Sequence, residues 1–229
     1  MYASFAWTDV AEARNRITRR FEPIQPFLLL ELARAAGSEA FIDVGANIGL
    51  YSVFLSSLPS IERITAFEAA PATFEALRAV VDANGLAARM DLRNLAVSAS
   101  DAPVTFGIMG PVSGANGVVD TTIHKTARFS GTITVASTRL DEALELRDRR
   151  ICLKIDVEGH EAPVVAGAER TLTGNLCVLQ IEAYGGETGA IDALAALGFR
   201  RCFAAGPDIY MTNDPALFDA DRLLGVFEA

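Results

Sequence analysis

The chain has 229 residues, of which 51% are hydrophobic, and its formal net charge is −9. This length and composition suit one globular domain and exclude a disordered chain. No stretch approaches the roughly 18 consecutive apolar residues of a membrane span, so we expect a cytoplasmic protein with no integral membrane segment. An acidic surface repels nucleic acids and anionic lipids, so neither is an expected partner.

The first 37 residues are predicted to form a helical extension, because helix formers at 14–20 and 26–36 precede Gly37. Residues 38–229 alternate between short apolar runs and helical stretches. We expect strands at 41–44, 61–67, 90–97, 151–157, 177–182, 201–205 and 209–212, and helices at 48–58, 71–84, 139–146, 162–172 and 191–197. This alternation predicts a doubly wound α/β domain with a mostly parallel sheet and helices on both faces.

The middle of the chain has a different character. Strand-like stretches at 104–108 and 132–137 flank a Gly-rich loop at 110–117, which predicts an inserted β-hairpin with a mobile loop. Insertions at the carboxyl edge of a parallel sheet are where α/β enzymes place specificity. We therefore expect this loop and the N-terminal extension, acting as a lid, to cover an acceptor.

The first predicted strand runs into a D-x-G-x-x-x-G turn that extends from Asp43 through Gly45 to Gly49. Glycines at these positions let the backbone approach a ligand and let the next helix pack close to the strand. The second strand ends at Glu68, where an acid can accept hydrogen bonds from both hydroxyls of a ribose. The two features together predict a nucleoside across the tips of these strands.

The glycine spacing indicates which nucleoside binds. A pyrophosphate cofactor favours G-x-G-x-x-G, and no G-x-G occurs here. Asp43 would repel a phosphate but tolerate an amino group or a sulfonium, which fits S-adenosylmethionine. At the end of the third strand, Asn94 and Ala96 fall where the adenine edge would lie, although ordinary strand positions explain them equally well.

A second informative stretch, LKIDVEGHE, occupies residues 153–161. Strand alternation places Lys154 and Asp156 on one face, with Asp156 at the carboxyl end beside the cofactor. The neighbouring strand ends at Glu182, so we expect Asp156, His160 and Glu182 to converge. Lys154 is interpreted as a structural partner of one of these acids.

The acids Glu158 and Glu161 fall at the start of the next helix, where the helix dipole favours negative charge. We interpret both as helix-start residues, and Glu161 in particular as structural. Three cysteines, Cys152, Cys177 and Cys202, lie far apart in apolar stretches, which predicts buried reduced thiols. With only two histidines and no zinc spacing, no zinc site is expected.

Three motifs together resemble the FkbM family of methyltransferases: FIDVGANIG at 41–49, FEA at 67–69 and LKIDVEGHE at 153–161. The resemblance implies a Rossmann-like class I methyltransferase fold with a seven-stranded sheet. It also implies S-adenosylmethionine as cofactor, S-adenosylhomocysteine as product, and O-methylation of a sugar, glycan or polyketide hydroxyl. The predicted cofactor-binding residues are Asp43, Gly45, Ala46, Asn47, Gly49, Glu68, Ala69, Asn94, Ala96 and Asp156.

Two mechanisms fit the predicted catalytic residues Asp156, His160 and Glu182. Either Asp156 or His160 acts as a general base, or Asp156 and Glu182 hold a divalent ion such as Mg²⁺. We favour the metal-free base, because only two carboxylates converge and no third ligand is evident. Two rival interpretations are a nicotinamide-dependent oxidoreductase, which the missing G-x-G disfavours, and a non-catalytic scaffold, which the intact motifs disfavour.

Overall fold

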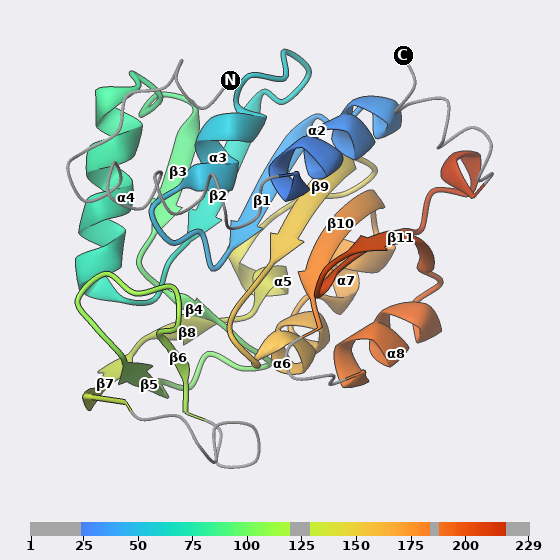
Figure 1. The fold of residues 1–229 in the computed structure, drawn as a ribbon. Helices are drawn as coiled ribbons and strands as arrows, with labels where there is room; N and C mark the ends of the chain where they lie inside the picture. Colours follow the sequence, from blue (N-terminus) through green and yellow to red (C-terminus); the bar gives the residue numbers. More distant parts are fainter. Residues whose placement is uncertain (1–23, 120–128, 184–187, 219–229) are drawn as a thin grey trace.

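The computed structural model describes residues 24–119, 129–183 and 188–218 (Figure 1). Its centre is a seven-stranded sheet with the order β11-β12-β10-β9-β1-β2-β3. The strands are β1 (Ala40–Val44), β2 (Arg63–Phe67), β3 (Met90–Arg93), β9 (Arg150–Ile155), β10 (Leu176–Glu182), β11 (Arg200–Ala205) and β12 (Asp208–Thr212). Only β12 runs antiparallel to its neighbours, which confirms the predicted mostly parallel sheet.

Helices cover both faces of this sheet, which explains why strands such as β1 are buried almost throughout. The helices are α2 (Gln25–Ala36), α3 (Leu50–Leu55), α4 (Pro71–Ala83), α5 (Leu140–Ala143), α6 (Glu161–Ala166), α7 (Glu169–Thr173) and α8 (Gly189–Ala196), and a 3₁₀ turn spans Pro215–Leu217. None of the described helices has the length and apolarity needed to cross a bilayer.

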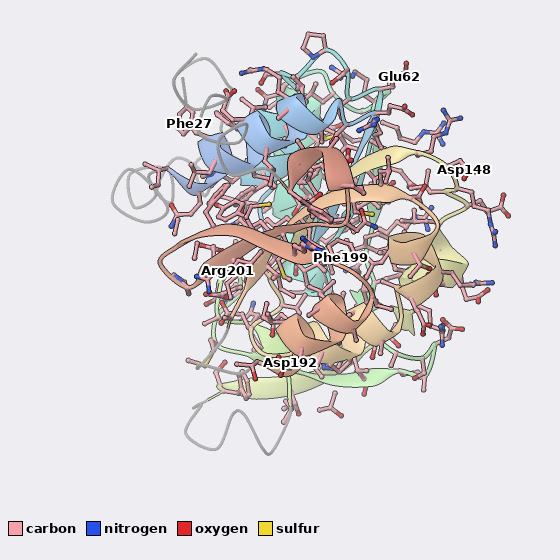
Figure 2. The ribbon with its side chains drawn as sticks, turned by 90° about the vertical axis from the view of Figure 1, so that its right-hand side faces the viewer. Phe27, Glu62, Asp148, Asp192, Phe199 and Arg201 are labelled. Atoms are coloured by element: carbon pink, nitrogen blue, oxygen red, sulfur yellow. The ribbon has the colours of Figure 1, made fainter. Side chains whose placement is uncertain are left out.

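Alternation along the strands divides the core into two layers. Phe41, Cys152 and Val178 face α2, α3 and α4, whereas Ile42 and Leu153 face α5 to α8. In the side view of Figure 2, the side chains fill the space between helices and sheet. Phe199 lies in that interior, whereas Glu62 and Asp148 lie at the surface.

The helix α2 packs on the sheet as part of the first of these layers. Leu29 and Leu32 are fully buried there, in the same cluster as Phe41. Residues 25–36 are therefore one layer of the main core. The predicted helix at 14–20, and the part of the predicted 1–37 lid that precedes residue 24, lie outside the described residues.

The insert forms a small sheet of its own at one end of the molecule (Figure 1). As predicted, β5 (Val104–Ile108) pairs antiparallel with β7 (Gly131–Val135). A third strand, β6 (Gly117–Val118), pairs with the other edge of β5. The sequence analysis missed β6 because two residues are too few to produce an alternating pattern.

Two predicted elements are divided in the structure. The stretch 90–97 forms β3 and then β4 (Ala96–Val97), which pairs with β8 (Ser137–Thr138) away from the main sheet. The helix expected at 162–172 is split into α6 and α7 around Gly167. A Cβ at Gly167 would lie 2.0 Å from the Ser98 carbonyl oxygen, so the chain after β4 packs directly against this break.

Candidate active site

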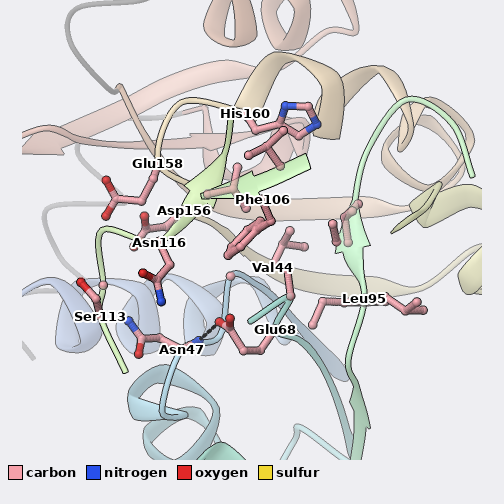
Figure 3. Close-up of a pocket in the computed structure, with 18 residues that line it drawn as sticks. Val44, Asn47, Glu68, Leu95, Phe106, Ser113, Asn116, Asp156, Glu158 and His160 are labelled. Carbon is pink, nitrogen blue, oxygen red and sulfur yellow. Dashed lines mark hydrogen bonds between the residues drawn. The ribbon is translucent and has the colours of Figure 1, made fainter. Parts of the chain in front are cut away.

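A pocket opens at the carboxyl ends of β1, β2 and β9 (Figure 3). The strand order reverses here, since β2 and β3 lie on one side of β1 and β9 and β10 lie on the other. Such a switch point is where open parallel sheets bind ligands. The empty space within the pocket and its open mouth is about 570 Å³.

The turn after β1 forms the floor of this pocket. Gly45 has a φ of 81°, and a Cβ there would lie 1.9 Å from the Asp156 carbonyl oxygen. The amides of Gly45 and Ala46 donate to the Phe67 carbonyl oxygen at 3.0 and 2.9 Å. Only glycine fits at position 45, because the turn bridges the ends of β2 and β9 at backbone contact distance.

Glu68 lies directly after β2 and lines the pocket. Its two carboxylate oxygens accept hydrogen bonds from the backbone amides of Asn47 (2.9 Å) and Ala70 (2.8 Å). Burial raises the pKa of Glu68 to about 7, against the opposing effect of these two bonds. Each oxygen can accept more than one bond, so the carboxylate is positioned to receive further donors from a ligand.

Asp43 does not line the pocket. The alternation of β1 directs Val44 into the pocket and Asp43 to the opposite face, where it is fully buried and accepts a hydrogen bond from Ser52 Oγ at 2.7 Å. Burial raises the pKa of Asp43, and the Lys154 ammonium opposes that shift. Asp43 therefore lies behind the turn, on the face away from the pocket, and is bonded to α3 through Ser52.

The other predicted cofactor residues divide into two groups. The residues that line the pocket are Gly45, Asn47, Glu68, Ala69, Ala96 and Asp156. Ala46 and Gly49 shape the turn without lining it; a Cβ at Gly49 would lie 2.6 Å from Leu77 Cδ1 of α4. The Asn94 side chain donates to the carbonyl oxygens of Glu68 and Ala69, so it fixes the backbone beside the pocket.

Three carboxyl groups converge beside the pocket. Oxygens of Asp156, Glu158 and Glu182 all lie within 4.8 Å of one another. The convergence of Asp156 with Glu182 agrees with the sequence analysis, whereas Glu158 was interpreted there as a helix-start residue. Glu158 has a φ of 56°, and that left-handed turn, which nothing but the following Gly159 signals in the sequence, brings its carboxyl group to the cluster.

Lys154 is the cation closest to this cluster in the described chain. Its ammonium donates to Asp156 Oδ2 at 2.7 Å and lies 4.7 Å from the centre of the Tyr51 ring. Behind it, Gln180 Nε2 donates to the Tyr51 hydroxyl and to Asp208 Oδ1 at 2.9 and 2.8 Å. Lys154 is thus the structural partner of an acid, in a buried polar network.

The Glu182 carboxyl group has a raised pKa. Burial, together with the nearby charges of Asp156, Glu158 and Asp208, raises the pKa of Glu182 to about 9. Glu182 therefore carries a proton at neutral pH. It can donate a hydrogen bond to a neighbouring oxygen, but it is not a base at that pH.

His160 does not join Asp156 and Glu182, contrary to the sequence analysis. Its Nε2 lies 3.0 Å from Ser98 Oγ, and Figure 3 shows the imidazole at the far side of the pocket from Glu158. The positive φ values of Glu158 and Gly159 turn the chain between Asp156 and His160. Alternation cannot be extended through such a turn, which is why the predicted convergence of His160 was wrong.

Glu161 is structural, as the sequence analysis expected. Its Oε1 accepts hydrogen bonds from the backbone amides of Val157 and Gly159, both at 3.1 Å. These bonds close the turn that separates Asp156 from α6. The turn that presents Glu158 is therefore held from within by the first residue of the following helix.

Comparison with known families agrees with this architecture. The model of the methyltransferase FkbM domain matches residues 43–201, more than half of the chain. The chain belongs to the FkbM methyltransferase family. The resemblance carried by the three sequence motifs is confirmed by this match.

A solved FkbM methyltransferase structure has the same fold as this FkbM family member. The methyltransferase FkbM from Methylobacillus flagellatus KT has a TM-score of 0.52 and 18% identity, over 77% of this chain and 43% of that chain. An O-methyltransferase from Bacillus cereus, in complex with SAH, has a TM-score of 0.47 and 11% identity, over 83% and 79%. The chain spans less than half the length of the FkbM structure. A comparison with curated proteins gave no match.

Proposed function

We propose that this FkbM family member is an S-adenosylmethionine-dependent enzyme that O-methylates a hydroxyl group of a sugar, glycan or polyketide-type small molecule. The observation that carries the proposal is the meeting of Gly45, Glu68 and Asp156 in one pocket at the switch point of the sheet. Membership of a methyltransferase family supports methyl transfer as the reaction. The acceptor class rests on the family resemblance.

The residues present fit the proposed cofactor. Gly45 lines the pocket without a side chain, so a ligand can lie against its main chain. Glu68 offers a carboxylate to the two ribose hydroxyls. The turn has one glycine where a diphosphate-binding turn has a G-x-G, and two further carboxyl groups, Asp156 and Glu158, line the pocket and disfavour a diphosphate.

Asp156 is the proposed general base. When bound, S-adenosylmethionine supplies a methyl group on a sulfonium sulfur and becomes the thioether S-adenosylhomocysteine. As the acceptor oxygen forms its bond to that carbon, its proton passes to the Asp156 carboxylate. Lys154 compensates the charge of Asp156 through the 2.7 Å bond, and protonated Glu182 stands beside it as a hydrogen-bond donor.

A divalent ion such as Mg²⁺ is the second candidate for this place, because Glu158 supplies the third carboxyl group that the sequence analysis lacked. One feature weighs against it: the Lys154 ammonium already donates to Asp156. We therefore retain the metal-free base as the proposal.

Calorimetry on a substituted pocket tests the cofactor. We expect the wild type to bind S-adenosylmethionine and S-adenosylhomocysteine but not NAD. Glu68→Ala removes two charge-assisted hydrogen bonds of roughly 1.5–3 kcal/mol each, so affinity should fall at least about 100-fold. Asn94→Ala, which loosens the same backbone without removing the carboxylate, is the matched control. Unchanged affinity in Glu68→Ala would remove Glu68 from the site.

A methyl-transfer screen tests the reaction. Cofactor labelled in its methyl group is offered with sugars, lipid-linked sugars and polyketide acceptors, and the product is analysed for the position of the label. We expect an O-methyl product. Label found only on nitrogen or carbon would overturn the proposed O-methylation while leaving cofactor binding intact.

A further inference from the structure

The pocket has a polar end and an apolar end (Figure 3). Asn47, Asp156 and Glu158 lie at the polar end. The apolar end is lined by Leu95, Ala96, Val97, Phe106 and Val118. In Figure 3, Glu68 lies between Asn47 on one side and Leu95 on the other. The pocket therefore offers two chemically different compartments on either side of the Glu68 carboxyl group.

The position of Glu68 decides which part of a nucleoside enters which compartment. This orientation rests on the proposed function, in which Glu68 holds the ribose. The amino-acid part must then extend toward Asp156, because the proposed base has to face the transferred methyl group. The purine must extend the other way, into the apolar end. A purine has apolar faces and suits a flat aromatic partner.

Phe106 is the aromatic residue that the insert contributes to the apolar end. It is 6% exposed and packs with Ala70, Ala96 and Val135. Its strand β5 is held on both edges, because Phe106 pairs with Val118 of β6 and with Ile133 of β7. The ring is thus fixed in place before any ligand binds.

The strand β6 of the insert also packs against the pocket. A Cβ at Gly117 of β6 would lie 3.1 Å from Glu158 Cβ, so the two backbones pack closely. The buried Asn116 side chain closes the preceding loop by accepting from the Met109 amide at 2.8 Å and donating to the Gly110 carbonyl oxygen at 3.1 Å. The insert contributes lining residues to both ends of the pocket: Ser113 and Asn116 lie beside Asn47 at the polar end in Figure 3, whereas Phe106 packs with Val118 in the apolar cluster.

His160 lies at the end of the apolar compartment. The Ser98 amide donates to the Thr138 carbonyl oxygen at 2.9 Å, which fixes Ser98 beside the β4–β8 pair. Ser98 Oγ in turn lies 3.0 Å from His160 Nε2 and orients the imidazole. This role accounts for the placement of His160 away from the carboxyl cluster.

We propose that the insert forms the base-binding compartment of the cofactor pocket, with the purine stacked on Phe106 and the Ser98-oriented imidazole of His160 closing its end. From the sequence, only the loop at 110–117 of the insert was expected to cover the acceptor. The structure assigns β5 and β6 to the cofactor, so the insert is needed for cofactor binding before any acceptor is present.

Calorimetric titration with S-adenosylhomocysteine tests this proposal without an acceptor. Phe106→Ala should weaken binding about tenfold, the scale of an aromatic–base stack. Phe106→Leu keeps an apolar side chain and removes the flat ring, so it should also weaken binding. Val135→Ala is the matched control, because Val135 packs in the same cluster without lining the pocket. Its affinity should stay within about twofold of the wild type.

A second ligand separates the two ends of the pocket. Adenosine lacks the amino-acid part, so Phe106→Ala should weaken adenosine by the same factor as S-adenosylhomocysteine. If Glu68→Ala loses S-adenosylhomocysteine but both Phe106 variants bind it like the wild type, this inference alone is wrong. An equal loss in Val135→Ala would also overturn it, since the effect would then come from the stability of the small sheet. A wild type that binds no S-adenosylhomocysteine overturns both this inference and the proposed function.

Discussion

Glu68 and Glu182 are both largely buried carboxyl groups at the carboxyl ends of parallel strands, and they differ in what surrounds them. Glu68 receives two backbone amides, and its pKa is raised by burial to about 7. Glu182 faces Asp156, Glu158 and Asp208, and its pKa is raised to about 9. Backbone donors keep one group ready to accept hydrogen bonds, whereas neighbouring acids keep the other protonated. The surroundings, more than burial, thus separate a binding role from a proton-holding role.

The largest expected effect comes from Asp156, the acid whose charge helps to keep Glu182 protonated. Asp156→Asn preserves the shape of the side chain and removes the proposed base. Methyl transfer to the acceptor found by the screen should fall by about 10²–10⁴, the usual contribution of a general base. Affinity for S-adenosylhomocysteine, measured by calorimetry, should change little.

Asp148→Asn is the control for this substitution. Asp148 is exposed and has a φ of 54°, a backbone conformation that Asn tolerates. Its turnover should match the wild type. Near-normal turnover in Asp156→Asn itself would mean that positioning alone suffices and that Asp156 is no base.

The second largest expected effect is a pH dependence of cofactor affinity, which tests whether the Glu68 carboxylate binds the ribose. Because the pKa of Glu68 is raised to about 7 in the unliganded protein, ribose hydroxyls that bind the carboxylate must displace a proton at lower pH. Affinity for S-adenosylhomocysteine should therefore rise about tenfold between about pH 6 and pH 8. Titrations in buffers of different ionisation enthalpy measure the released proton. A pH-independent affinity would contradict the proposed contact.

As the pH rises, the contribution of Glu68 and Glu182 to the stability of the unliganded protein should fall, whereas the affinity for S-adenosylhomocysteine rises. A carboxyl group whose pKa is higher in the folded state than in the unfolded state keeps its proton up to a higher pH when the protein is folded. Glu68 and Glu182 therefore favour the folded state at low pH, and that contribution is lost as the pH rises from about 4.5 toward 7 for Glu68 and toward 9 for Glu182. Thermal unfolding across this range measures it, and a stability that rises throughout would show that other groups dominate.

The smallest expected effect, that of Glu182→Gln, distinguishes a protonated Glu182 from a Glu182 that binds a metal ion. Gln resembles a protonated Glu, so Glu182→Gln should retain turnover within about threefold, and EDTA should leave turnover unchanged. If Glu182 were a Mg²⁺ ligand, the same substitution would remove its negative charge, so metal binding and turnover should both fall. The contrary result is that EDTA abolishes an activity that Mg²⁺ or Mn²⁺ restores, and that Glu182→Gln is inactive. That result would show that the cluster of Asp156, Glu158 and Glu182 binds a metal ion.

The sequence predicted those parts of the molecule that follow from strand periodicity. The alternation of apolar runs predicted the sheet, and the strand ends predicted Gly45, Glu68 and the approach of Asp156 to Glu182. What it missed lies in irregular backbone. The positive φ of Glu158 both brings that carboxyl group into the cluster and turns His160 away from it. No residue pattern encodes the direction of a side chain across such a turn.

Asp43 shows a different limit of sequence reasoning. Its place in the glycine-containing turn suggested a ligand contact, but it is still the fourth residue of β1 and therefore faces α3 through Ser52. The predicted strand at 41–44 already contains Asp43, so strand alternation alone places it on the face opposite Val44. The glycine-containing motif identified the turn, but it did not identify the face of β1 on which Asp43 lies.

The antiparallel strand β12 has a consequence for how the protein is made. It lies between β10 and β11 in the sheet and supplies Asp208, to which Gln180 donates. A chain emerging from the ribosome presents β9 and β10 well before β12, so the network behind Asp156 stays incomplete until nearly the whole domain has been synthesised. We expect stalled nascent chains that end before β11 to be cut readily by protease, and chains that extend past residue 218 to resist it. Equal resistance would show that the site assembles without its last strand.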